Sequence, residues 1–196
     1  MRTIRQGSFL ILLGILVGCA DIHYSQIKGG KLTGKLLVEW IDADLFIFTP
    51  DNEKPLTFTR YNTESITPGR MLTDGGSIPR PLWVMRSYSP WGYGPAFIVH
   101  DWLFEMRHCQ YEGFEKYSFE ESAKVLSEVI KTLMVDPKYK FEDSLSMYAI
   151  YEAVRSPIAK KRWDEGTCSP PPPRVTKDKT LPNGMTPKIL YVIEFP

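Results

Sequence analysis

The sequence predicts one α+β domain, in which a small antiparallel sheet packs with a cluster of about three helices. Hydrophobic residues form 43% and aromatic residues 13% of the 196-residue chain, which suffices for a core and excludes wholesale disorder. Short β-type runs gather before residue 62, and helical periodicities gather between residues 95 and 163. A last β-type run closes the chain, and we expect it to return to the N-terminal sheet.

Composition also excludes several classes of function. Lys and Arg number 24 and Asp and Glu number 23, so no basic surface for nucleic acid is indicated. We expect no nucleic-acid partner, and no motif in the sequence indicates a particular protein partner. The P-loop, Rossmann, G-x-S-x-G and H-E-x-x-H motifs do not occur in the sequence.

The N-terminus has the pattern of a targeting segment. Two arginines, Arg2 and Arg5, precede an apolar run over residues 9–17 that is too short to span a bilayer as a mature helix. The sequence Leu16-Val17-Gly18-Cys19 resembles the bacterial lipobox, in which cleavage precedes an acylated cysteine. We therefore expect a lipoprotein signal peptide over 1–18 and lipidation of Cys19. An ordinary signal peptide with a chance cysteine and a plain transmembrane anchor are the alternatives.

Lipidation would place the protein in the cell envelope, anchored to the membrane. Ala20 follows the cysteine, and by resemblance to enterobacterial sorting rules this residue favours the outer membrane, facing the periplasm. That compartment is oxidising, so Cys109 and Cys168 are a candidate disulfide. Two unpaired thiols are the alternative.

The elements are expected in the following order. Residues 19–34 are polar and glycine-containing, and we expect them to be a tether; the family domain would span 35–165, and a Pro-rich segment with the last strand would span 166–196. Strands are expected over 36–40, 45–48 and 56–61, followed by a Gly/Pro-rich loop over 67–95. The final strand is expected over 188–195.

Three helices are expected after the loop. The first covers about 95–108, with Pro95 at an early helical position. The second follows a capping box, Ser118 to Glu121, and continues to about Val135. The third covers about 142–163 and is interrupted near Pro157.

Two segments contain the candidate chemistry. The first is Thr73-Asp74-Gly75-Gly76-Ser77-Ile78-Pro79-Arg80, an acidic Gly-rich loop that could offer oxygen ligands to a hard cation such as calcium. The second is His100-Asp101 on the first expected helix, where adjacent side chains point about 100° apart and serve different partners. The candidate catalytic residues are Asp74, Ser77, His100 and Asp101, and Asp74 with Asp101 are the candidate metal ligands.

A purely structural interpretation stands beside the functional one. Asp74 and Ser77 could cap their own turn, and His100 could donate to a backbone carbonyl. Asp101 could pair with Arg80 or Arg86. The aromatic loop around Trp83 could pack over the helices or present a lipid or sugar surface. The sequence does not decide whether the protein is an enzyme.

A family resemblance appears at these segments. TDGGSIPRPLW, GYGPAFIVHDWLF and MYAIYEAVR resemble a bacterial and tailed-phage family, domain of unknown function 1353. The matching positions are Asp74, Ser77, Pro79, Arg80, Trp83, His100, Asp101, Ala153, Val154, Arg155 and Trp163, with Phe104 in place of the usual Tyr. The resemblance covers about 35–165 and implies no established reaction. Arg80 and Trp83 are the candidate binding residues.

The motif order is also similar to bacterial calcium-dependent phospholipases of the A-two type. That resemblance implies His100 as a general base for water, with Asp74 and Asp101 holding calcium. A carboxylate on the second helix would orient the histidine. This chain has Ala123 and Lys124 at the corresponding place, so Glu120 or Glu121 would have to substitute.

Overall fold

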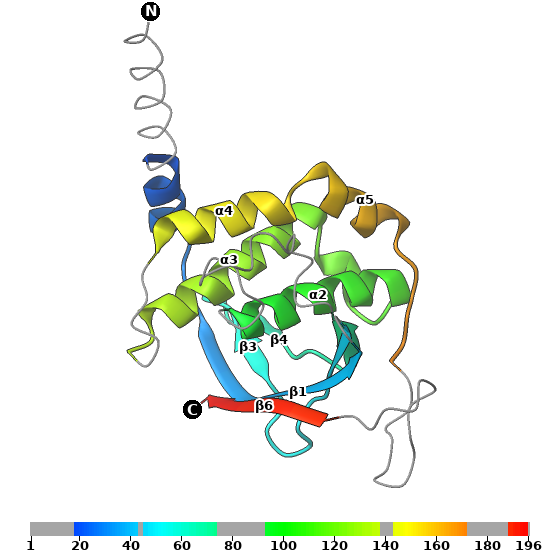
Figure 1. Ribbon diagram of the computed structural model, residues 1–196. Helices are drawn as coiled ribbons and strands as arrows, with labels where there is room; N and C mark the ends of the chain where they lie inside the picture. Colours follow the sequence, from blue (N-terminus) through cyan, green and yellow to red (C-terminus); the bar gives the residue numbers. More distant parts are fainter. Residues whose placement is uncertain (1–17, 43–44, 74–92, 138–142, 172–187, 196) are drawn as a thin grey trace, which may run out of the picture.

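The computed structural model describes residues 18–42, 45–73, 93–137, 143–171 and 188–195. These residues form an α+β fold, as predicted. A curled antiparallel sheet is covered by α2 and α3, and α4 and α5 lie on the far side of those two helices (Figure 1). Helix α2, which carries His100 and Asp101, therefore lies between the sheet and the outer helices.

The sheet is organised around one long strand, β1 (Lys31–Asp42). Its first residues pair with β3 (Thr57–Thr59), and its later residues pair with β2 (Leu45–Phe48) and β6 (Lys188–Phe195). The short strands β4 (Ser65–Ile66) and β5 (Met71–Thr73) continue the sheet at its two ends, in the order β4-β3-β1-β2-β5. All of these strand pairs are antiparallel.

The predicted return of the C-terminal strand is confirmed. β6 pairs with β1 over seven positions, from Gly34 opposite Phe195 to Trp40 opposite Lys188. β4 and β5 were not predicted, and β5 lies inside the expected loop over 67–95. Strands of two and three residues are too short for an alternating pattern to emerge from the sequence.

The expected tether over 19–34 is wrong in the structure. Residues 18–26 are helical, and β1 already begins at Lys31. The helix has a buried face because Ala20 is fully buried and Tyr24 and Ile27 pack against the core. Polarity and glycine content suggested a linker, but the i, i+3, i+4, i+7 spacing of Ala20, His23, Tyr24 and Ile27 is that of an amphipathic helix.

The helices agree closely with the expected ranges. α2 covers Gly94–Cys109, α3 covers Phe119–Val135, and the third expected helix is two, α4 (Ser144–Val154) and α5 (Pro157–Glu165). A short 3-10 turn, η2 (Phe114–Lys116), joins α2 to α3. The interruption falls at Pro157 because proline lacks the amide that would continue the helix, and Ser156 caps the new start.

Only half of the predicted capping box forms. The Ser118 hydroxyl accepts a hydrogen bond from the Glu121 amide at 3.1 Å. The Glu121 carboxylate binds Arg60 instead of returning to the Ser118 amide. A partner from a distant strand therefore replaces the local contact that the motif predicts.

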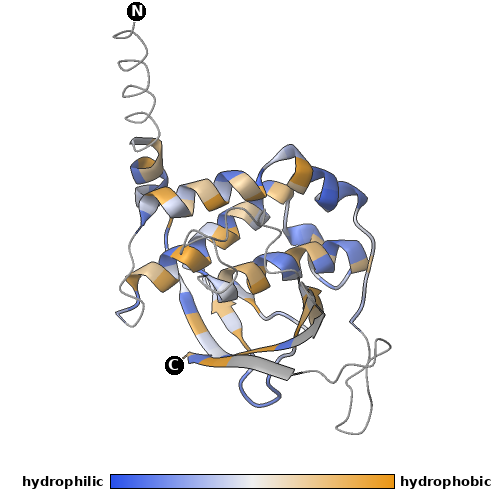
Figure 2. Ribbon diagram, in the orientation of Figure 1, coloured by the Kyte–Doolittle hydropathy of each residue, from blue (hydrophilic) through white to orange (hydrophobic). Residues whose placement is uncertain are grey.

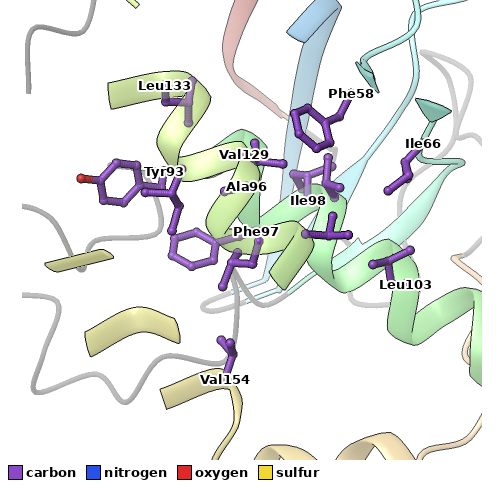
Figure 3. Close-up of a cluster of buried hydrophobic side chains, with 14 of the residues drawn as sticks. Phe58, Ile66, Tyr93, Ala96, Phe97, Ile98, Leu103, Val129, Leu133 and Val154 are labelled. Carbon is purple, nitrogen blue, oxygen red and sulfur yellow. The ribbon is translucent and has the colours of Figure 1, made fainter. Parts of the chain in front are cut away.

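The core lies between the sheet and the two inner helices. Phe58 and Ile66 from the sheet face Phe97, Ile98 and residues of α3 in one apolar cluster (Figure 3). The helices that cover the core carry both apolar and polar residues, and α5 is mostly hydrophilic (Figure 2). Burial of side chains of this size stabilises the fold by roughly 1.5–3 kcal/mol each.

A disulfide closes the helical side of the fold. Cys109 at the end of α2 is bonded to Cys168 after α5, with an S–S distance of 2.01 Å. This decides between the two alternatives that the sequence left open. The bond fastens α5 to α2, where Trp163 also packs edge-on against Phe104 with 4.8 Å between ring centroids.

Candidate functional site

Helix α2 holds the two central site residues in different environments. His100 is 4% exposed and faces α3, whereas Asp101 is half-buried and faces β5. This divergence is what the helical rotation of about 100° per residue predicts for neighbours. Each side chain is therefore oriented by its own partner.

A backbone carbonyl orients the His100 ring. Its Nδ1 lies 3.2 Å from the Ser122 carbonyl oxygen on α3. A carbonyl only accepts, so Nδ1 carries the hydrogen and Nε2 is the basic nitrogen in the neutral ring. The ring also packs against Phe104, 5.0 Å away between centroids. Position and tautomer of the imidazole are thus both determined by the fold.

A hydroxyl group orients the Asp101 carboxylate. Thr73 Oγ1 donates to Asp101 Oδ2 at 2.6 Å, and Thr73 is 5% exposed at the end of β5. Hydrogen bonds to a charged acceptor are stronger than neutral ones. This bond fixes the end of β5 against the middle of α2.

A glycine allows β5 and α2 to approach one another. A Cβ placed on Gly69 would lie 2.5 Å from Cη2 of Trp102, the residue after Asp101. No side chain larger than hydrogen fits there without displacing the indole. The Trp102 ring also stacks on Tyr111. Gly69 and Trp102 thus set the distance over which Thr73 reaches Asp101.

The remaining predicted site residues lie outside the described residues. These are Asp74, Ser77, Arg80 and Trp83, all within 74–92. Asp74 follows Thr73 directly in the chain, and Thr73 is the last described residue before that segment. The structure therefore places His100 and Asp101, and gives the contact that joins Asp101 to the residue preceding Asp74.

The carboxylate that the phospholipase resemblance required is not the partner of the His100 Nδ1. That partner is the main-chain carbonyl of Ser122, and Ala123 beside it is fully buried. Glu121 is bound to Arg60, and Glu120 is exposed at the start of α3. A main-chain oxygen thus takes the orienting position in which we expected Glu120 or Glu121.

A second buried polar group was not predicted from the sequence. Arg60, 5% exposed, donates from Nε and Nη2 to both oxygens of Glu128, which is 1% exposed. The same guanidinium binds Glu64 at 2.9 Å and Glu121 at 2.5 Å. Tyr117 donates to Glu64 at 2.8 Å. We call these five residues the Arg60 cluster.

The electrostatics of the Arg60 cluster are mutually supporting. Hydrogen bonds to Glu128 raise the pKa of Arg60, so the guanidinium is charged at any accessible pH. Burial, with the hydrogen bond to Glu64, raises the pKa of Tyr117. One signal in the sequence could have found Glu128: it lies between Val125, Leu126, Val129 and Ile130, where a charge needs a buried partner.

Other candidate residues have ordinary structural contacts. His108 Nε2 lies 3.0 Å from the Arg162 carbonyl oxygen, which links α2 to α5. His23 is not in a tether; its Nε2 lies 3.2 Å from Ser127 Oγ, and its ring packs on Tyr151. Cys19 is a free, exposed cysteine. Among the described residues, no helix has the length and apolar character needed to cross a membrane.

A shallow hollow of about 660 Å³ lies elsewhere, at the edge of the sheet. Its lining includes Lys31, Lys54, Pro55, Glu194 and Phe195. The ion pair of Lys54 and Glu194 is exposed on both sides, and such pairs contribute little free energy because water screens them. We assign no chemistry to this hollow.

Comparison with known proteins identifies the domain. Residues 53–149 match the family described as Protein of unknown function (DUF1353). The chain belongs to this family. The matched range includes β3, the Arg60 cluster, Thr73 and the His100-Asp101 pair, so the DUF1353 domain contains both buried polar groups. No curated protein and no solved structure matches the chain.

Proposed function

We propose that this DUF1353 protein is a lipid-anchored envelope protein with a hydrolase-like pocket at His100 and Asp101. The observation that carries the proposal is that adjacent side chains of α2 are fixed by separate partners, Ser122 and Thr73. Such preorganisation suits a base and a charge stabiliser that act on one bound molecule. The substrate class is envelope material, either lipid or peptidoglycan.

The roles follow from the chemistry of each group. His100, with its hydrogen on Nδ1, presents Nε2 as the general base for a water molecule. Asp101, with Asp74 of the adjoining segment, would hold a hard cation such as calcium, and Ser77 and Arg80 would contact the substrate with Trp83. A cation held there would stabilise negative charge that develops on the substrate oxygen.

Lipid anchoring draws its support from the N-terminal sequence and from the exposure of Cys19. Leu16-Val17-Gly18 precede the cysteine, and the thiol is free. Acyl chains add roughly 0.8 kcal/mol of membrane affinity per buried methylene, so several chains give a stable anchor. Mass spectrometry of the N-terminal peptide tests this part: a mature chain that starts at acylated Cys19 is expected.

Cation binding is tested by thermal melting of the detergent-solubilised chain with calcium or zinc. A saturable rise in Tm is expected for the wild type, because a ligand that binds only the native state stabilises it. Asp101→Asn is expected to abolish the rise. Asp164→Asn on α5, an exposed carboxylate, is the matched control and is expected to retain it. No rise with either cation would contradict this role of Asp101.

A second candidate is a non-catalytic structural or interaction lipoprotein of phage origin. It is favoured by the near-complete burial of His100 and its bond to a main-chain carbonyl. Under this candidate, His100→Asn would keep the Nδ1-like donor and retain every envelope phenotype. Under the hydrolase proposal the same variant keeps its fold and loses the activity.

A further inference from the structure

We infer that the outer layer of the fold, formed by the helix over 18–26, α4 and α5, is a face that docks on the phospholipid bilayer. We call it the membrane face. The inference rests on the lipid anchoring proposed above, and it adds the orientation of the domain on the membrane. The partner is the bilayer surface itself.

The first step is that the anchor point is attached rigidly to the domain. Cys19 belongs to a helix that packs on the fold through Ala20, which is fully buried. The Asp21 carboxylate accepts from Ser144 at the start of α4, at 2.7 Å. Lys131 on α3 donates to the Tyr24 carbonyl oxygen. A lipid on Cys19 therefore holds the whole domain within one short helix of the bilayer.

The helix over 18–26 has one side against the domain and one side exposed. Ala20, His23, Tyr24 and Ile27 face the domain, whereas Cys19 and Ile22 are exposed. Positions i and i+3 of a helix share a face. Ile22, with 58% of its surface exposed, thus lies on the same side of the helix as the anchor.

The third step is the distribution of exposed apolar residues. Among the described residues, the large exposed hydrophobics are Ile22, Tyr61, Val135, Leu145, Ile158 and Val192. Ile22, Leu145 and Ile158 belong to the three helices of the membrane face. Ile158 is the most exposed, at 73%. If this layer faces the membrane to which Cys19 is attached, these exposed apolar side chains would enter the acyl boundary of the leaflet.

The arrangement of the layers gives the orientation. The helix over 18–26 rises beside α4, on the side of the molecule opposite the sheet (Figure 1). With the membrane face on the bilayer, α2 and α3 lie beneath it and the sheet with β6 points away into the aqueous space. Val192 on β6 is then far from the lipid.

The test uses the full chain, processed in a bacterium and reconstituted into phosphatidylethanolamine–phosphatidylglycerol vesicles. Spin labels are attached to single cysteines introduced as Leu145→Cys and Ile158→Cys. Val192→Cys is the matched control because this side chain is also exposed, at 53%, and lies on β6. Acylated Cys19 and the Cys109–Cys168 disulfide leave no competing thiol among the native cysteines.

At positions 145 and 158 we expect several-fold higher accessibility to oxygen, relative to a water-soluble nickel chelate, than at position 192. The double variant Leu145→Asp with Ile158→Asp should still float with vesicles, because Cys19 is still acylated. In this variant, a spin label that replaces Ile22 should no longer have a higher oxygen accessibility than a label at position 192. Equal, water-like accessibility at positions 145, 158 and 192 of a floating, acylated protein overturns the membrane face alone. Failure to float, with an unmodified Cys19 by mass spectrometry, overturns both the anchoring and the face.

Discussion

The two buried polar groups of this domain lie at equivalent places, each joining a strand end to an inner helix, but they are built differently. In the Arg60 cluster a cation beside β3 is bound by three carboxylates, two of them on α3. In the His100-Asp101 pair, one residue binds a main-chain oxygen and the next binds a hydroxyl. Each member of the Arg60 cluster binds another member of the cluster. The His100-Asp101 pair instead links α2 to Thr73, the residue before segment 74–92.

This difference indicates which polar group stabilises the fold and which is available for chemistry. A buried charge network is costly to interrupt because each removed partner leaves an uncompensated charge. The contacts of His100 with the Ser122 carbonyl and of Asp101 with the Thr73 hydroxyl are single hydrogen bonds to uncharged groups, and removing one such bond costs less than opening a buried charge network. We expect the Arg60 cluster to set stability and the pair to set activity.

The largest effect is expected from removing the cation of the Arg60 cluster. Arg60→Met leaves Glu128 buried without its partner and should lower the free energy of unfolding by about 3–5 kcal/mol. Urea unfolding followed by circular dichroism measures this. The double variant Arg60→Met with Glu128→Leu should recover much of the loss. A cost below about 1 kcal/mol for Arg60→Met would contradict a stabilising role for the cluster.

The next effect is expected from the disulfide at the end of α2. Cys109 and Cys168 are 59 residues apart in sequence. Replacing both with serine should lower the free energy of unfolding by about 2–4 kcal/mol, because the unfolded chain gains conformational entropy when the cross-link is removed. Urea unfolding of the double variant, compared with the wild type under oxidising conditions, checks the value. If His100 and Asp101 depended on this bond, cation binding would be lost along with stability; we expect it to persist.

A smaller effect is expected where the pair meets β5. Thr73→Val removes the hydroxyl that donates to Asp101 and keeps the side-chain shape, so it should cost about 1–2 kcal/mol. Its cation-dependent rise in Tm should need a higher cation concentration, because Asp101 is less well oriented. Thr57→Val, at a hydroxyl pair on the sheet, is the control. An unchanged cation titration in Thr73→Val would argue against Asp101 as a ligand.

The smallest effect is a pH dependence at the helix over 18–26. Half-burial lowers the pKa of His23, so the folded state binds this proton less readily than the unfolded state. Its contribution to stability is therefore complete above the ordinary pKa of about 6.5 and declines as the pH falls through that value toward the lowered folded pKa. Hydrogen exchange of amides 20–27 at pH 7.5 and 5 should show faster opening at pH 5. His23→Gln should be insensitive to this change of pH.

Much of the fold could be predicted because its signals are local. Pro95, Ser118 and Pro157 mark helix starts. The final apolar run over 188–195 has the pattern of a strand, and a strand requires a hydrogen-bonding partner, which is β1 of the N-terminal sheet. The helix over 18–26 was missed because its polar residues and the glycines that follow outweighed the helical spacing of Ala20, His23, Tyr24 and Ile27. β4 and β5 were missed because they are defined by their partners in the sheet.

The candidate site could be predicted only in part, for the same reason. His100 and Asp101 were found because histidine and aspartate are adjacent in a motif. Ser122 could not be found, since every residue has a carbonyl and only the packing of α3 on α2 selects this one. The Arg60 cluster joins residues up to 68 positions apart, a contact that no spacing in the sequence reveals.

The hydrolase-like pocket is tested most directly by comparing His100→Asn with His100→Ala in the hydrolysis of phospholipid vesicles and of purified peptidoglycan by the full chain. Asn keeps a donor near the Ser122 carbonyl but supplies no base, so we expect a Tm close to that of the wild type and loss of hydrolysis. His100→Ala should lose hydrolysis and about 1–3 kcal/mol of stability as well. Hydrolysis that is retained by a well-folded His100→Asn protein, or absent from the wild type with both substrates, would contradict the hydrolase-like pocket.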